Sequence, residues 1–328
     1  METRRLGGLL AGLLVAFMLI HFFPPCSLAA EKYPSQAIEL FQPYSVGGPT
    51  DIINRLIAKK FEVYFGGTVI PQSKPGAGGA VLASYLAKAR PDGYTLGIPT
   101  FTHIAVPIIE GKASYSLSDF HIIGQVVVFP CALIVSVDSQ FKTFRDLITY
   151  AKEKPVKYAM QGYATTIAQR FFNLFKYLDM KMEPVHFTGD AQITTAILGE
   201  HVSVGTVSAG TAKGLIDSGK ARCLFIFESP ADFGLPADIE NLQSLLGGAP
   251  FTDIEPSVVL VGQSKIPPEI LRALEGAYGK LMKDEEFKKL LDTLHLRLGY
   301  MDGKTFTQKV PSMMKTIEEI MRSTGQLK

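Results

Sequence analysis

Short apolar segments alternate with longer helical segments along most of the chain, and this alternation constrains the fold more than any other feature. Residues 38–43 are largely apolar and end at a proline, which is typical of a strand, and apolar residues then recur at helical spacing over residues 50–65. Strands that alternate with helices pack as sheets covered by helices, so we predict an α/β fold with mostly parallel, doubly wound sheets. The other expected strands are 68–70, 94–98, 122–137, 156–160, 183–187, 202–207, 221–227 and 256–262, and the other expected helices are 79–89, 143–153, 165–178, 190–199, 210–218, 267–281, 284–294 and 304–324.

Two apolar, β-branched segments have the character of strands that cross between two lobes. Residues 122–137 form the first crossing, and residues 221–227 form the expected return. Two crossings between two α/β lobes predict a hinge with a cleft beside it, and clefts between domains commonly bind small ligands. We therefore expect a first lobe of residues 31–128 and 229–328 and a second lobe of residues 129–228.

The first thirty residues have the layout of a secretory signal peptide. Two arginines precede an uncharged apolar run at residues 6–23, and prolines and small residues follow it, so we expect residues 1–30 to be removed and the protein to be periplasmic. A retained transmembrane anchor is the alternative, since a run of about 18 residues is long enough to cross a bilayer. A lipid anchor on Cys26 is a third interpretation, although Phe23-Pro24-Pro25 match the lipoprotein pattern poorly.

Charge and cysteine content exclude several classes of protein. Removal of residues 1–30 takes away two arginines and one glutamate, which lowers the formal charge from +2 to +1. A near-neutral chain without a basic run is not expected to bind nucleic acid. Only Cys131 and Cys223 remain, so the fold is not a disulfide scaffold. Both fall on expected crossing strands, where they form either a disulfide or two buried thiols; we favour thiols because a bridge would stiffen the hinge.

A glycine-containing loop at residues 43–51 joins the first strand to the first helix. Gly47 and Gly48 permit a tight turn with uncovered amide groups, and the helix that follows offers further N–H donors and a partial positive charge. Such a loop can bind an anion without a basic side chain. The alternative is a plain turn in which Asp51 caps its helix. The second glycine-rich loop, 75–79, lacks the spacing of a dinucleotide site and is expected to shape the lobe wall.

No arrangement of residues typical of catalysis is present in the sequence. The histidines at 21, 103, 121, 186, 201 and 295 form no zinc-binding motif, and no nucleophile elbow occurs. His103 follows a strand end and could face the cleft, but a structural role is the favoured interpretation. We therefore expect no enzyme activity, no cofactor and no metal.

Several segments resemble, in order and spacing, the solute-binding proteins of tripartite tricarboxylate transporters, the Bug family. The resemblance extends over about residues 33–328 and implies a type II periplasmic-binding-protein fold that closes on its ligand about a hinge. It also implies that two loops, one from each lobe, hold a ligand carboxylate through amides, hydroxyls and waters, and that a cognate membrane permease receives the ligand. The matching segments are 33–35, 43–51, 75–79, 91–96, 117–120, 218–222 and 265–267.

Carried over to this chain, the family's two loops correspond to Tyr44–Asp51 and to Gln161–Thr166. The chain departs from the family pattern at Ala164, at Ala168-Gln169, where a histidine is usual, and at Val207, where an aspartate is common. The resemblance gives these candidate ligand-binding residues: Tyr44, Ser45, Gly47, Gly48, Thr50, Asp51, Thr100, Phe101, Thr102, Gly162, Tyr163, Thr165, Thr166, Thr206, Val207 and Ser208.

These departures suggest which ligand to expect. Loss of the aspartate at Val207 argues against an amino-acid ligand, and Phe101 and Tyr163 favour an apolar or aromatic carboxylate over citrate. The protein is expected to be a monomer that delivers its ligand to a tripartite tricarboxylate-type transporter. A periplasmic ligand-sensing subunit for a signalling kinase is the alternative function, and a degenerate protein without a ligand is a further one.

Overall fold

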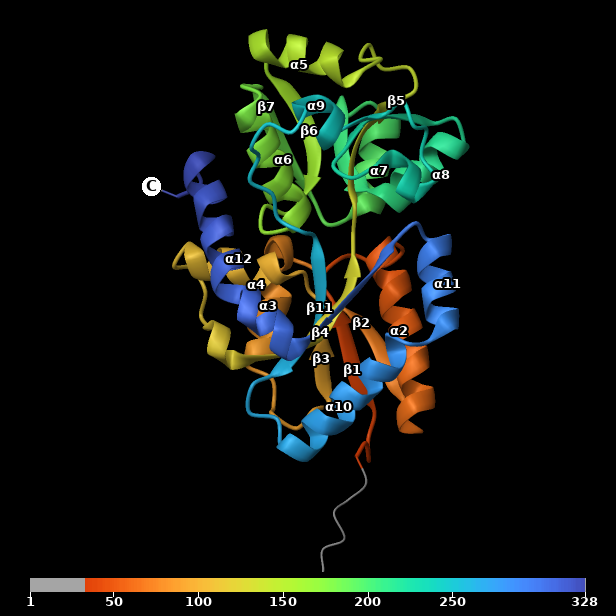
Figure 1. The fold of residues 1–328 in the computed structure, drawn as a ribbon, viewed down its shortest axis with the longest axis vertical. Helices are drawn as coiled ribbons and strands as arrows, with labels where there is room; N and C mark the ends of the chain where they lie inside the picture. Colours follow the sequence, from red (N-terminus) through yellow and green to blue (C-terminus); the bar gives the residue numbers. More distant parts are fainter. Residues whose placement is uncertain (1–32, 328) are drawn as a thin grey trace, which may run out of the picture. The chain divides into compact units, whose positions relative to one another are not determined.

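The computed structural model describes residues 33–327, and residues from Gln36 onward form one compact unit. The expected signal peptide and Cys26 lie outside the described residues. The compact unit contains two six-stranded sheets, each flanked by helices, which we call the first and second lobes (Figure 1).

The sheet of the first lobe has the strand order β12-β4-β11-β3-β1-β2. β1, β2 and β3 are mutually parallel, whereas β11 runs antiparallel to both of its neighbours and β12 antiparallel to β4. The strands are β1 (Ile38–Gln42), β2 (Val69–Ser73), β3 (Thr95–Gly97), β4 (Phe120–Val128), β11 (Ser257–Gln263) and β12 (Arg297–Asp302). The helices are α2 (Pro49–Phe65), α3 (Ala80–Ala87), α4 (Phe101–Ile109), α10 (Pro268–Leu281), α11 (Glu285–Thr293) and α12 (Gly303–Ser323), with 3-10 turns at Ala77–Gly79 and Leu117–Asp119.

The sheet of the second lobe has the order β10-β9-β5-β8-β6-β7, and only β5 runs antiparallel to its neighbours. The strands are β5 (Cys131–Ser136), β6 (Val156–Gln161), β7 (Met182–Phe187), β8 (Val204–Ser208), β9 (Ala221–Ile226) and β10 (Glu240–Asn241). The helices are α5 (Phe144–Glu153), α6 (Thr166–Tyr177), α7 (Asp190–Leu198), α8 (Ala209–Asp217) and α9 (Leu242–Leu246), with a 3-10 turn at Pro230–Phe233.

The two-lobed α/β fold agrees with the sequence, and most strands of each sheet run in one direction, as expected. The strands that run the other way are β5 and β11, which carry the chain from the hinge into the second and the first lobe, and β12 at a sheet edge. A strand that enters a lobe from the hinge must run opposite to strands whose carboxyl ends face the hinge. The directions of β5 and β11 therefore follow from the two crossings.

The crossings differ in detail from those expected. The first is not one strand, because Pro130 lacks an amide N–H and separates β4 from β5. The expected return strand, 221–227, stays in the second sheet as β9, paired with β5 and β10. The chain returns between α9 and β11, and Phe129 N–H donates to Pro256 O at 3.1 Å, which ties the two crossing segments together.

The lobe boundaries remain a proposal. The division at 128/129 agrees with the change of sheet between β4 and β5. The pairing of β10 with β9 favours moving the second boundary from 228 to a point between Asn241 and Ser257.

The two cysteines lie on neighbouring strands but are not bonded. Cys223 pairs with Ile134 of β5, whereas Cys131 pairs with Ser208 of β8. They also belong to different hydrophobic clusters, and each is a buried free thiol. The preference for two thiols is confirmed, and neither crossing is stiffened by a disulfide.

Candidate ligand-binding site

A cavity lies between the two lobes. Its walls are built from the ends of strands and the starts of helices. The first lobe and the hinge contribute Tyr44, Ser45, Gly48–Asp51, Ile98, Thr100, Phe129, Pro256 and Val258, and the second lobe contributes Gln161, Thr166, Ile167, Gly189–Gln192 and Ser208.

Helix N-termini from both lobes meet at this cavity. α2 begins at Pro49, α6 at Thr166 and α7 at Asp190, and all three residues line the cavity. The backbone amides of Thr50, Thr166, Ile167 and Ala191 have no hydrogen-bond acceptor within residues 33–327. Uncovered amides at helix N-termini attract anions through both hydrogen bonding and the helix dipole. The cavity therefore offers N–H donors from two sides to one carboxylate.

The loop before α2 is held by two buried polar side chains. Gln42 accepts from Tyr44 N–H at 2.8 Å and donates to Tyr44 O at 2.7 Å. Asp51 accepts from Gly47 N–H and from Arg55, both at 3.1 Å. Gly47 has φ +89°, which a residue with a side chain rarely adopts. Asp51 thus fixes the turn from within, as in the plain-turn interpretation, while the amide of Thr50 stays available for an anion.

Tyr44 receives its orientation from His103. His103 Nδ1 accepts from Thr100 N–H at 3.1 Å, so the ring proton is on Nε2, which lies 3.4 Å from the Tyr44 hydroxyl. Burial lowers the pKa of His103 to about 3, so the ring is neutral. Because Tyr44 accepts from this ring, its own O–H is free to donate to a ligand in the cavity. His103 has the structural role that was favoured.

A buried carboxylate, Asp190, lies on the second-lobe side of the cavity. Its Oδ2 accepts from Ser208 N–H at 3.0 Å and from the Ser208 and Thr211 hydroxyls, both at 2.7 Å. Its Oδ1 accepts from Gln161 Nε2. The side chain therefore ties α7, α8 and β6 together beside the ligand space.

The lobes touch directly on either side of the cavity. Ser45 N–H donates to Thr188 O at 3.3 Å, and the Ser45 and Thr188 hydroxyls lie 2.7 Å apart. The buried hydroxyls of Thr102 and Thr166 are 2.9 Å apart. Because these contacts join opposite lobes across the cleft, the structure has a closed arrangement.

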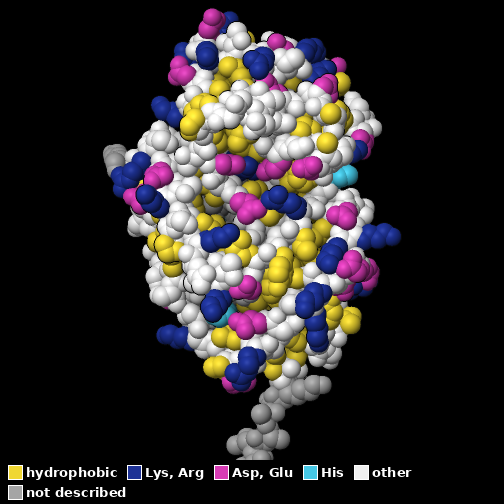
Figure 2. All heavy atoms as spheres, in the orientation of Figure 1, with side chains coloured by type: hydrophobic (Ala, Val, Ile, Leu, Met, Phe, Trp, Pro, Cys, Tyr) yellow, Lys and Arg dark blue, Asp and Glu magenta, His cyan; other side chains and the backbone are white. Residues whose placement is uncertain are grey.

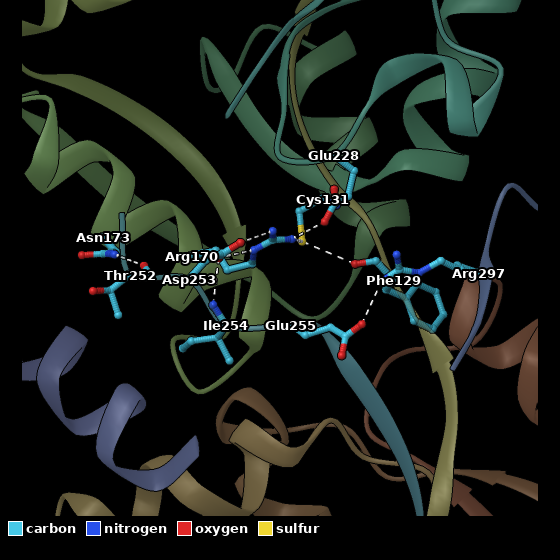
Figure 3. Close-up of polar contacts among 10 residues, drawn as sticks. All are labelled: Phe129, Cys131, Arg170, Asn173, Glu228, Thr252, Asp253, Ile254, Glu255 and Arg297. Atoms are coloured by element: carbon cyan, nitrogen blue, oxygen red, sulfur yellow. Dashed lines mark hydrogen bonds and ion pairs between the residues drawn. The ribbon is translucent and has the colours of Figure 1, made fainter. Parts of the chain in front are cut away.

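Beside the hinge, a buried arginine joins the second lobe to the returning chain. Arg170 of α6 donates to both oxygens of Asp253, at 2.7 and 2.6 Å, and to Glu228 at 2.7 Å (Figure 3). The guanidinium also lies 3.9 Å from the centre of the Phe227 ring. Burial alone would lower the pKa of Arg170, but Glu228 and Asp253 outweigh burial and raise it, so the charge is retained. We call Arg170, Glu228 and Asp253 the hinge clamp.

Half of the candidate residues from the sequence line the cavity. These are Tyr44, Ser45, Gly48, Thr50, Asp51, Thr100, Thr166 and Ser208. The structure does not place the others on its wall. Gly47 lies in the turn, Thr165 caps α6, Thr102 bonds Thr166, Thr206 bonds Ala159 O, and Gly162 contacts Gly78.

The residues that suggested an aromatic ligand do not face the cavity. Phe101 packs against Phe306, with ring centres 5.5 Å apart, and Val207 lies in the core of the second lobe. The Tyr163 hydroxyl donates to Glu110 at 2.7 Å, outside the cavity. The expected apolar character of the pocket thus has no support from these three side chains.

Sequence reasoning missed the contribution of the β7–α7 junction. Gly189, Asp190 and Gln192 line the cavity there. The signal was available, since Thr188-Gly189-Asp190 follows an expected strand and begins an expected helix, as the two recognised loops do. Gln161, at the end of β6, was part of the matched loop but was not chosen as a ligand residue.

None of the helices in residues 33–327 combines the length and apolar character needed to cross a membrane. In the same part of the chain, no three His, Cys, Asp or Glu side chains are grouped to hold a metal ion. Basic and acidic side chains are interspersed on the face in Figure 2, in keeping with the small net charge.

The chain is similar to known proteins in both sequence and fold. The family described as tripartite tricarboxylate transporter family receptor matches residues 53–326. The chain is similar to the UPF0065 protein in the gbd 5' region of Cupriavidus necator, with 27% identity over 307 residues, or 93% of this chain and 92% of that protein.

Two solved structures share the fold. The periplasmic binding protein BugD has a TM-score of 0.81 and 20% identity, covering 89% of this chain and 99% of its own. The R. palustris protein Rpa4515, solved with adipate, has a TM-score of 0.79 and 20% identity, covering 89% and 98%. These likenesses confirm the two-lobed α/β fold of periplasmic binding proteins.

Proposed function

This chain belongs to the tripartite tricarboxylate transporter receptor family, and from that membership we propose that it captures a small carboxylate outside the cytoplasmic membrane and delivers it to a membrane permease. The observation that carries this proposal is the set of uncovered amides at Thr50, Thr166, Ile167 and Ala191, which converge on the cavity from both lobes. The adipate bound by a protein of the same fold agrees with a carboxylate ligand.

The mechanism of capture follows from the two-sided arrangement of donors. A carboxylate that enters the open cleft meets the N-terminus of α2 and the Tyr44 hydroxyl on the first lobe. Closure then adds the amides of Thr166 and Ala191 from the second lobe. Because the second set is available only in the closed form, the ligand binds that form more tightly and shifts the population toward it. The permease would recognise the closed form.

Substitutions at Thr166 test the capture site, because this residue is the first of α6. Thr165 has φ −76° and ψ 151°, which is compatible with a following proline, and proline is well tolerated at a first helical position. Thr166→Pro removes the amide N–H, whereas Thr166→Val removes only the hydroxyl. Isothermal titration against a panel of small carboxylates should find a ligand for the wild type.

We expect Thr166→Pro to weaken that ligand about 10- to 100-fold, because hydrogen bonds to charged groups contribute about 1.5–3 kcal/mol. Thr166→Val should bind within severalfold of the wild type. A panel in which no carboxylate binds, or equal affinity for Thr166→Pro and the wild type, would contradict the proposed site.

A further inference from the structure

One buried acceptor beside the cavity has no donor. Gln161 is 6% exposed and lines the cavity, and its Oε1 has no hydrogen-bond partner among residues 33–327. The orientation of its amide is fixed, because Nε2 donates to Asp190 Oδ1 and a reversed amide would place two oxygens against each other. A buried acceptor left without a donor is unfavourable, so this corner of the site favours a ligand that supplies one.

Asp190 adds to the acceptor character of this corner. Its Oδ2 already accepts three hydrogen bonds, from Ser208 and Thr211. Its Oδ1 accepts only from Gln161, and a carboxylate oxygen can accept more than one hydrogen bond. Asp190 also occupies the first position of α7, next to the uncovered amide of Ala191. Acceptors for a donor group and donors for a carboxylate therefore lie side by side.

The charged residues that line the cavity also favour a ligand with a hydrogen-bond donor. Asp51 and Asp190 line the cavity, and no lysine or arginine of residues 33–327 lines it. Asp51 is paired with Arg55 at 3.1 Å, whereas the partners of Asp190 within the described part of the chain are neutral. A purely anionic ligand would face this carboxylate without compensation, while a cationic or hydroxyl group on the ligand would satisfy it.

We propose that the ligand is a carboxylate with a hydrogen-bond donor on the carbon next to the carboxyl group, an ammonium or a hydroxyl, and that Gln161 and Asp190 select for this donor. This inference rests on the proposed function and names the substrate class of the same cavity. It places in Asp190 the acidic group that the sequence lacks at Val207. Amino and hydroxy acids then become the expected ligands, in place of aromatic acids.

Matched sets of acids test the selection directly on the wild-type protein. Each set keeps the chain length and changes one group: propionate, lactate and alanine; succinate, malate and aspartate; glutarate, 2-hydroxyglutarate and glutamate. Within the set that binds best, isothermal titration should show the amino or hydroxy acid at least about tenfold tighter than the unsubstituted acid, because a site with a buried acceptor rejects the analogue that lacks the donor. The preferred one of the two identifies the donor group.

Asp190→Asn tests the residues. The oxygen of asparagine can still accept from Ser208 and Thr211, but its NH₂ group then faces Gln161, whose amide must turn and present a donor to the ligand. The preference for the amino or hydroxy acid over the unsubstituted acid should fall at least about tenfold. Asp217→Asn, a surface carboxylate of α8 paired with Lys213 outside the cavity, should retain the wild-type ratio. Gln161→Met removes the acceptor oxygen and puts no donor in its place. It is the second test variant if Asp190→Asn fails to fold.

The outcomes separate the two proposals. Unsubstituted acids that bind as tightly as their substituted partners overturn the selection and leave carboxylate capture intact. A ratio unchanged in Asp190→Asn or Gln161→Met also overturns it. If no carboxylate in any set or in the wider panel binds, carboxylate capture fails and this inference fails with it.

Discussion

His103 lies between the second glycine-rich loop, residues 75–79, and Tyr44 of the cavity wall. Its contacts explain what that loop does. A Cβ atom at Gly79 would lie 2.3 Å from His103 Cδ2, and Gly79 has φ +93°. The second glycine-rich loop therefore leaves room for the imidazole, which in turn orients Tyr44. This agrees with the structural role expected for that loop. The ring must stay neutral to keep Nδ1 as an acceptor for Thr100 N–H.

The neutral ring predicts a loss of stability in acid. Burial lowers the pKa of His103 from its ordinary value of 6.5 to about 3 in the folded protein, so the unfolded chain binds the proton first as the pH falls. Its contribution is complete above pH 6.5 and is lost progressively toward pH 3, by about 1.4 kcal/mol per pH unit. Urea unfolding between pH 7 and 4 should therefore show a shallower pH dependence for His103→Asn than for the wild type.

The exposed His201 provides the matched control for this measurement. His201→Asn should keep the pH dependence of unfolding that the wild type shows, because this side chain is exposed to solvent in the folded protein and His103 is still present. An identical slope for His103→Asn and the wild type would show that the ring takes up its proton in the folded state without penalty.

Helix α6 links the ligand site to the hinge, because its first residue lines the cavity and Arg170 lies one turn further along. We expect Arg170→Met to cost about 2–4 kcal/mol of unfolding free energy, since it leaves Glu228 and Asp253 without their buried cation. Met retains the apolar stem against Phe227.

Arg145→Met is the control: Arg145 is 72% exposed and paired with Glu240, so about 1 kcal/mol or less is expected. Urea unfolding with equal losses for both variants would exclude the hinge clamp as a stabilising unit.

The elements that the sequence predicted correctly are those with a clear period, such as α2 and α6. Helix α4 was missed because Phe101–Ile109 is apolar on nearly all sides and contains Pro107, so it has no helical period. Strand β12 was missed because Arg297–Asp302 has no alternation and includes a glycine. The loops of the site were found from glycine spacing and the family resemblance. Asp190 was not, because its role depends on Gln161, Ser208 and Thr211, which come together only in the folded chain.

In the closed arrangement, the main chains of the two lobes are in direct contact at one pair of glycines. Gly78 of the first lobe and Gly162 of the second are so close that a Cβ atom at Gly162 would lie 2.1 Å from Gly78 Cα. A side-chain rotation cannot relieve this overlap, because the atoms nearest to such a Cβ belong to the main chain of Gly78. The glycine at position 162 is therefore required by the closed arrangement, and not by the conformation of its own loop, which has no positive φ at this residue.

Gly162→Ala should consequently separate closure from folding. Each lobe keeps its own core, so we expect the stability in urea to change by less than about 1 kcal/mol. The closed form should be penalised by about 1–3 kcal/mol, as in overpacked cores, which weakens the carboxylate ligand about 5- to 150-fold and reduces the ligand-induced decrease in radius of gyration measured by small-angle scattering. Gly214→Ala is the control, because a Cβ atom there meets nothing within 4 Å. If Gly162→Ala binds and contracts like the wild type, the lobes close by a path that does not bring these two glycines together, and ligand affinity is then set within the cavity alone.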